Sequence, residues 1–183
     1  AFQPDNLAAS TDGRFIAAWK GSQVQLFDLG TSEASPAKNL GSVVSEVAFM
    51  GQTLFVRLQG SKGVQVFDLN QAAKRLFEPW LVRLGPQDET IARESSSQLL
   101  LPAPESGEML VGHPRLRAVF GLMEMSGMIA TAMNSFSVAG DDLHNLARID
   151  RKLAPLGVGR YGAKFVAQHE GDHELVITSA GYT

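Results

Sequence analysis

The chain contains no cysteine among its 183 residues. This absence excludes disulfide bonds, thiolate metal sites and cysteine nucleophiles within the chain. A cysteine-free chain suits an oxidising compartment, and on this ground a periplasmic or secreted location is favoured over the cytoplasm.

Long runs of apolar or of basic residues are also missing. No apolar run approaches the roughly 18 residues of a membrane-spanning helix, so no membrane span is expected. The 16 basic and 19 acidic residues give a formal net charge of -3. Because no basic cluster stands out, nucleic acid is not an expected partner.

Turn-forming residues are abundant, with 18 glycines in the chain. Together with Asp, Asn and Ser, the glycines separate short runs that are rich in β-branched and aromatic residues. This texture is typical of an all-β protein with many turns.

An internal repeat of about forty residues is the strongest pattern. VQLFDL at Val24–Leu29 recurs as VQVFDL at Val64–Leu69, and 64 - 24 = 40. The segments before them, LAASTDGRFIAAWKGS and VAFMGQTLFVRLQGSKG, share the order strand, turn, strand, turn. Each unit therefore predicts three strands, of which the VQ-containing strand is the third.

The third strand of the second unit is apolar on both faces. Alternation places Val64 and Val66 on one face, and Phe67 and Leu69 on the other. We therefore expect stacked sheets to cover both sides of it.

Later units are weaker copies of the first two. One reads SQLLLPAPESGEMLVGH, the next ends in LARID, and the last begins at YGAKFVAQ. The predicted blades lie near residues 1–40, 41–80, 81–115, 116–155 and, as a partial unit, 156–183. At about 40 residues a blade, the chain holds about four and a half blades, so we expect a ring to be completed by further chain or another subunit.

A period near forty with three or four strands is typical of β-propellers. TDGRFIAAW and VQLFDL resemble blades of WD-repeat and YVTN-type bacterial propellers, in which a turn such as S-P-D-G-R precedes the second strand. Here Thr11 stands where proline is common. Phe27-Asp28 and Phe67-Asp68 replace the Trp-Asp dipeptide, and the Gly-His pair of WD-repeats is absent from both units.

This resemblance covers residues 7 to 69. It implies an all-β fold, a β-propeller or partial propeller of about 40-residue blades that forms a single domain over residues 1–183. Asp28 and Asp68 recur at the repeat period and are interpreted as structural residues that make turn or inter-strand hydrogen bonds.

Near the end of the chain, the residues from His169 to His173 read HEGDH, which fits the H-E-x-x-H pattern of zinc peptidases. That chemistry needs both histidines on one helix face, with Glu170 as general base. Gly171 and Asp172 are poor helix formers, and the following ELVIT is strand-like. Alignment with LAAS-TDG-RFIAA favours a turn between two strands. A surface zinc site made by the two histidines, and a metallopeptidase, stay as alternatives.

Five of the six methionines fall within residues 109–133, and Met123, Met125 and Met128 spell M-x-M-x-x-M. Thioethers are soft ligands that select Cu(I), and His113 is near in sequence. Methionine also fills irregular gaps in cores. We favour the core interpretation and keep copper as the alternative.

Two further patterns receive structural interpretations. Asp141, Asp142 and His144 in AGDDLH are too few for a calcium or catalytic site and predict a solvated loop. GVGRYG at residues 157–162 resembles a dinucleotide-binding loop but precedes a strand-like run, so a connection between blades is favoured.

Architecture of this kind does not fix a function. Because rigid blades present loops, and loops carry recognition, we expect a non-enzymatic scaffold for protein–protein interaction, with a protein partner and no cofactor. The competing hypothesis is a periplasmic propeller that binds a metal or redox cofactor. It requires the histidines or the methionine cluster to converge on one cavity.

Overall fold

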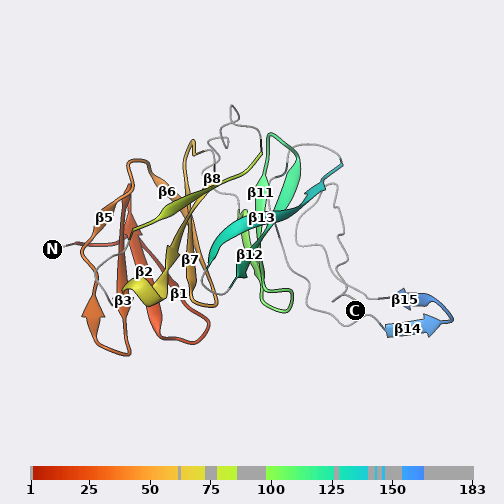
Figure 1. Ribbon diagram of the computed structural model, residues 1–183, viewed down its shortest axis with the longest axis horizontal. Helices are drawn as coiled ribbons and strands as arrows, with labels where there is room; N and C mark the ends of the chain where they lie inside the picture. The colour runs from red at the N-terminus through yellow and green to blue at the C-terminus, as the bar shows by residue number, and fades with distance from the viewer. Residues whose placement is uncertain are drawn as a thin grey trace.

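The computed structural model describes residues 2–61, 63–72, 78–85, 98–125, 128–139, 143, 146 and 154–162. In this part of the chain the fold is all-β, as predicted, with a single short helix, α1 (Leu69–Ala72). The strands form three antiparallel sheets of four or five strands and one two-stranded hairpin. Figure 1 shows the sheets following one another along the long axis in sequence order, from the N-terminal sheet to the hairpin.

Sheet 1 pairs its strands in the order β1–β2–β3–β4, with β5 also paired to β3. The bounds are β1 (Asn6–Ala9), β2 (Phe15–Lys20), β3 (Gln23–Asp28), β4 (Glu33–Ala34) and β5 (Lys38–Asn39). The predicted TDG turn joins the first two strands. The Ser10 hydroxyl accepts the Phe15 N–H at 2.8 Å and donates to Asp12 at 2.6 Å, while Gly13 takes a φ of 71° that favours glycine.

Sheet 2 repeats this order as β6–β7–β8–β9. The bounds are β6 (Val44–Met50), β7 (Thr53–Leu58), β8 (Gly63–Asp68) and β9 (Trp80–Arg83). VQLFDL and VQVFDL occupy the equivalent strands β3 and β8, which confirms the repeat over these two units. Asp28 pairs in register with Phe15, and Asp68 with Thr53. The sequence prediction of three strands a unit missed the fourth strand of each sheet.

The repeated aspartates are structural, as predicted. The Asp28 carboxylate accepts the Gly30 N–H at 2.9 Å, and Asp68 accepts the Asn70 N–H at the same distance. Asp28 also accepts two hydrogen bonds from the Arg14 guanidinium, at 3.0 and 3.2 Å. These hydrogen bonds tie the turn after β1, which contains Arg14, to the end of β3. They also lower the pKa of Asp28, because they stabilise its charged form.

Sheet 3 has the order β10–β11–β12–β13. The bounds are β10 (Leu100–Ala103), β11 (Glu108–His113), β12 (Ala118–Met125) and β13 (Met128–Ser137). The predicted boundary between blades 81–115 and 116–155 is wrong, because it falls in the turn between β11 and β12, which pair directly. Apolar residues of both strands pack on sheet 2 together, so one sheet replaces parts of two predicted units.

The hairpin pairs β14 (Ala154–Gly157) with β15 (Arg160–Gly162). GVGRYG, which was predicted to connect two blades, forms the tip and second strand of this hairpin, where Gly159 takes a φ of 69° at the turn. Its role as a connection between blades stays a prediction. The predicted turn at HEGDH lies outside the described residues.

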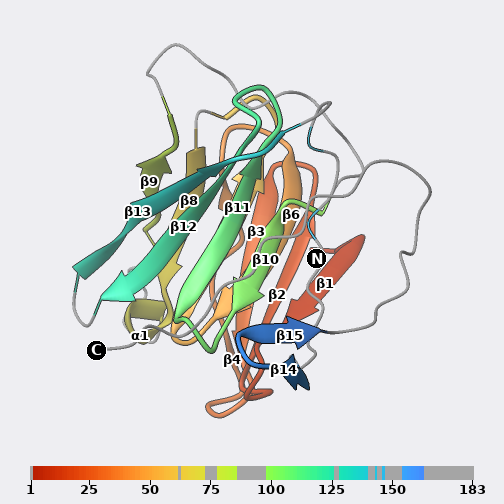
Figure 2. The ribbon, with the colours of Figure 1, turned by 90° about the vertical axis from the view of Figure 1, so that its right-hand side faces the viewer.

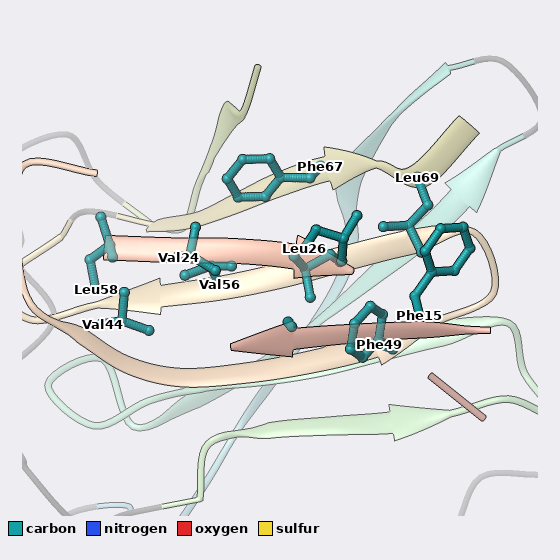
Figure 3. Packing of buried hydrophobic residues seen from close by; sticks show 11 residues of the cluster. Phe15, Val24, Leu26, Val44, Phe49, Val56, Leu58, Phe67 and Leu69 are labelled. Carbon is teal, nitrogen blue, oxygen red and sulfur yellow. The ribbon is translucent and has the colours of Figure 1, made fainter. Parts of the chain in front are cut away.

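Two apolar clusters hold the sheets together. The first cluster lies between sheets 1 and 2, where strands from both sheets direct apolar side chains toward each other (Figure 3). The buried members of this cluster are Phe15, Ala17, Val24, Leu26, Val44, Phe49, Leu54, Val56, Leu58, Phe67 and Leu69. The second cluster joins sheets 2 and 3, and includes Met50, Phe55, Val64, Val66, Val82, Leu84, Leu100, Met109, Val111 and Leu122.

The second cluster confirms that β8 is covered on both faces. Phe67 packs toward sheet 1, while Val64 and Val66 pack toward sheet 3. The first strands of the sheets also meet, because β6 lies against β1 on one side and β10 on the other. Figure 2 shows the stack from its hairpin end, with the strands of sheet 3 in front of those of sheets 1 and 2. None of the helical residues that the structure describes forms a segment long and apolar enough to cross a membrane.

Candidate functional site

The predicted zinc ligands His169 and His173 lie outside the described residues, as do Asp141, Asp142 and His144. Within the part of the chain that the structure describes, no group of three or more His, Asp or Glu side chains is placed to hold a metal ion. Zinc binding by His169 and His173 therefore stays a prediction.

The three methionines predicted to bind copper lie at one end of β12 and β13. Met125 and Met128 are paired in register at the turn that joins these strands, after an irregularity that follows Met123. Met123 is partly buried on the face of sheet 3 that is turned away from sheet 2. Copper binding at this end of the sheet also stays a prediction.

His113 is fully buried and lies far from Met123 in the same sheet. It pairs with Ala118, whereas Met123 pairs with Glu108, so five residues separate them along the strand, or about 17 Å. Alternation also places them on opposite faces. His113 Nδ1 accepts the Leu116 N–H at 3.3 Å, and the ring meets Phe120 edge to face at 6.3 Å. The structure does not bring His113 to the methionines.

A charged site that the sequence reasoning missed lies between sheets 2 and 3. Glu46 on β6 and Arg57 on β7 are register partners, with Arg57 Nη1 3.8 Å from Glu46 Oε2. The side chains are 15% and 2% exposed. The Glu46 carboxylate also accepts the N–H groups of Leu99 and Leu100, both at 2.9 Å, at the start of β10. One carboxylate therefore ties the first strand of sheet 3 to the first strand of sheet 2.

Burial disfavours the charged form of the Glu46 carboxylate, and several partners favour it. Burial raises the pKa of Glu46, while the N–H groups of Leu100 and Leu99 and the Arg57 charge act in the opposite direction. Burial has the larger effect. Because both carboxylate oxygens accept backbone hydrogen bonds, the arrangement suits fastening two sheets.

A pH dependence of stability follows from the raised pKa of Glu46. The folded chain binds this proton more tightly than the unfolded chain, so the contribution of Glu46 to the free energy of unfolding is largest below its ordinary pKa of 4.5. That contribution declines as the pH rises through the folded pKa. Urea unfolding at a series of pH values should show wild type losing stability relative to Glu46→Gln as the pH rises above 4.5, because glutamine does not titrate. A wild type that gains stability relative to Glu46→Gln over this range would contradict the linkage.

The hairpin presents the most exposed apolar side chains of the described residues. Leu156, Val158 and Tyr161 are 67%, 105% and 66% exposed. Tyr161 shares one face with its register partner Pro155, whereas Leu156 lies on the other face and leans over Gly162. Val158 is at the tip, so apolar side chains occupy both faces and the end.

The position of the hairpin makes these side chains accessible. β14 and β15 pair with each other in a sheet of their own, which lies beyond sheet 3 at the end of the long axis (Figure 1). A two-stranded hairpin is marginally stable by itself in water. Exposed apolar clusters on a soluble fold mark contact sites for other proteins. The hairpin is therefore the candidate functional site.

Comparisons with known proteins identify the architecture. No protein-family model and no curated protein matches the sequence. A Bacteroides fragilis NCTC 9343 protein assigned as a 6-phosphogluconolactonase matches with a TM-score of 0.52 and 13% identity, over 80% of this chain and 42% of that one. The dihydro-heme d1 dehydrogenase NirN in complex with DHE matches with a TM-score of 0.50 and 9% identity, over 74% of this chain and 28% of that one. This chain spans less than half the length of either structure, and the likeness shows a β-propeller-like fold.

Proposed function

We propose that this chain is a non-enzymatic, propeller-like scaffold for protein–protein interaction, with the β14–β15 hairpin as its contact site. The observation that carries the proposal is the exposure of Leu156, Val158 and Tyr161 on one projecting element. Large aromatic and aliphatic side chains supply most of the binding energy when a partner buries them. The stacked sheets supply a rigid base that presents the hairpin.

The two solved structures support the choice of architecture and leave the activity open. One is assigned as a lactonase and the other acts on a dihydro-heme, so similar folds carry different chemistries. The competing hypothesis, a periplasmic propeller with a metal or redox cofactor, depends on His169, His173 and the methionine cluster. Elemental analysis of the purified chain for zinc, copper and iron separates the two, because a stoichiometric metal favours the cofactor.

A hairpin variant tests the scaffold proposal directly. Replacing Leu156, Val158 and Tyr161 together by serine should weaken binding of the captured and then purified partner by more than about 30-fold, the loss of a hot spot worth about 2 kcal/mol. Calorimetric titration measures the change in Kd. The matched control is Leu81→Ser on β9, which removes a leucine that is 44% exposed outside the hairpin. Equal binding by both variants would remove the hairpin from the contact site and defeat the proposal.

A further inference from the structure

A buried histidine holds the turn that joins β11 to β12. His113, the last residue of β11, is 0% exposed, and its Nδ1 accepts the Leu116 N–H at 3.3 Å. The Arg117 N–H donates to the Pro114 carbonyl oxygen at 3.0 Å and closes the same turn. Because Nδ1 accepts a hydrogen bond, it carries no proton, and the neutral ring has its proton on Nε2.

The same turn makes a contact between sheet 3 and sheet 2. Leu116 reaches across to Gly85, just after β9, and its Cδ1 lies where a side chain at position 85 would begin. Gly85 takes a φ of 73°, which favours glycine, and the preceding Leu84 belongs to the apolar cluster between the two sheets. The hydrogen bond to His113 therefore fixes the backbone of the residue whose side chain touches sheet 2.

The backbone of the closed turn is strained at its last residue. Arg117 takes a φ of 46°, a conformation that residues with a Cβ rarely adopt. Its carbonyl oxygen accepts the Val138 N–H at 2.6 Å, so this end of the turn is also tied to the residue that follows β13. A strained conformation persists only while its surroundings hold it, so the loss of a hydrogen bond favours opening.

The His113 ring points into the apolar interface between sheets 2 and 3. Met109 and Val111, at alternate positions of the same strand, belong to the cluster in this interface, and Phe120 on β12 meets the ring edge to face. The side chains that the described parts of β9, β10 and β12 direct into the interface are apolar. Burial in such surroundings disfavours a charged ring.

The charged groups around the interface do not offset this burial. From sheet 2, Glu46 and Arg57 face sheet 3 as a pair of opposite charges, so their effects on an imidazolium oppose each other. Asp68 is at the far end of β8, where it pairs with Thr53. Exposed arginines on β9 and in the turn, and Glu108 on the other face of β11, complete the charged groups that the described elements bring near: Arg83, Arg115, Arg117 and Glu108.

We propose that the turn of residues 114–117 is an acid-sensitive latch, which closes Leu116 onto sheet 2 at neutral pH and opens when His113 takes up a proton from water. An imidazolium donates from both ring nitrogens, so a protonated Nδ1 and the Leu116 N–H would face each other as two donors. Opening exposes the charged ring to water and relieves the strain at Arg117. This inference does not depend on the hairpin as a contact site.

The pH range of the latch follows from the ordinary chemistry of histidine. An exposed histidine titrates near pH 6.5, whereas the closed latch excludes the proton, so opening becomes more favourable as the pH falls below about 6.5. About one pH unit lower, the equilibrium constant for opening should be about tenfold larger than at neutral pH. Glu46 acts in the opposite direction, because its contribution to stability is largest at low pH.

Amide hydrogen exchange at about pH 8 and about pH 5.5, each corrected for the intrinsic exchange rate, tests the latch. Protection of the Leu116 N–H should fall about tenfold at the lower pH. The Phe15 N–H, which the Ser10 hydroxyl accepts in the turn between β1 and β2, is the internal control and should keep its protection. A fall at both amides would mean general loosening by acid and would overturn the latch.

Two substitutions of the histidine separate titration from packing. His113→Asn places a side-chain oxygen near the position of Nδ1 and does not titrate, so its Leu116 N–H should be protected equally at both pH values. His113→Phe keeps an aromatic ring and removes the acceptor, so its Leu116 N–H should be poorly protected at both. A pH-dependent loss that persists in folded His113→Asn assigns the titration to another group and defeats the inference.

An NMR titration of the His113 ring in wild type decides the inference even if a variant fails to fold. The ring should gain its proton over the same pH range in which the Leu116 N–H loses protection. Equal protection of Leu116 at both pH values, or a protonated ring beside a protected Leu116 N–H, would overturn the latch. None of these results bears on the hairpin, which the serine variant tests separately.

Discussion

Glu46→Ala should lower the free energy of unfolding by about 3–5 kcal/mol, the usual cost of removing one member of a buried ion pair. The change leaves Arg57, which is 2% exposed, without the Glu46 charge, and it removes the acceptor for the Leu99 and Leu100 N–H groups. Unfolding in urea, followed by tryptophan fluorescence and circular dichroism, measures the loss.

Two further variants serve as controls for this loss of stability. Glu33→Ala removes an exposed carboxylate from β4 and should change stability by no more than about 0.5 kcal/mol. The double variant Glu46→Leu with Arg57→Met removes both charges and should recover much of the loss, because apolar replacements of a buried pair are often neutral or stabilising. A Glu46→Ala chain as stable as the Glu33→Ala chain would show that the carboxylate does not fasten the sheets.

Phe67→Ala should destabilise the chain by about 3–5 kcal/mol, because it opens a cavity in the cluster between sheets 1 and 2. Phe27→Ala, at the equivalent position of the repeat, should cost roughly 1 kcal/mol, since Phe27 is already partly exposed. The two substitutions share their local sequence, F-D-L, and their place in the third strand. The same urea measurement compares them.

The comparison isolates the effect of the neighbouring sheet. Strand propensity and the lost side chain are the same in both variants, so the expected difference of about 2–4 kcal/mol comes from burial. Equal losses would contradict this explanation, because they would mean that Phe27, on the face of sheet 1 turned away from sheet 2, is as well packed as Phe67.

The sequence predicted those parts of the fold that local patterns determine. The third strands around Phe27 and Phe67 have the predicted alternation, and Gly13 forms the predicted turn. The aspartates of the repeat accept the predicted turn hydrogen bonds. Each of these features depends on residues within one hairpin, where periodicity and turn chemistry are strong signals.

The missed features depend on contacts between distant segments. Glu46 stands in SEVAFM, where a charged residue indicates a solvated side of a strand. Its burial depends on the start of β10, where the N–H groups of Leu99 and Leu100 donate to the Glu46 carboxylate. These two residues come 53 and 54 positions later in the chain. A signal did exist, because Arg57 interrupts the apolar run TLFVRL, which pairs with the strand that was expected to be covered on both sides. A charge there calls for a buried partner.

The wrong boundary within sheet 3 has a different cause. The Pro114 turn has the composition of a connection between blades, and local sequence does not distinguish a turn inside a sheet from a turn between sheets. The pairing of β11 with β12 makes that distinction. The hairpin was missed for a similar reason, since its glycines indicate a turn without showing that strands flank it.

The stacking order also bears on how the chain assembles as it is synthesised. Each large sheet is built from consecutive strands, and it stacks on the sheet that left the ribosome before it. Contacts that are local in sequence favour fast folding, so sheet 1 can serve as a template for sheet 2. Sheet 2 then offers sheet 3 both an apolar face and the Glu46 acceptors. Sheet 3 therefore completes its packing only after both the apolar face and the carboxylate that receive it are in place.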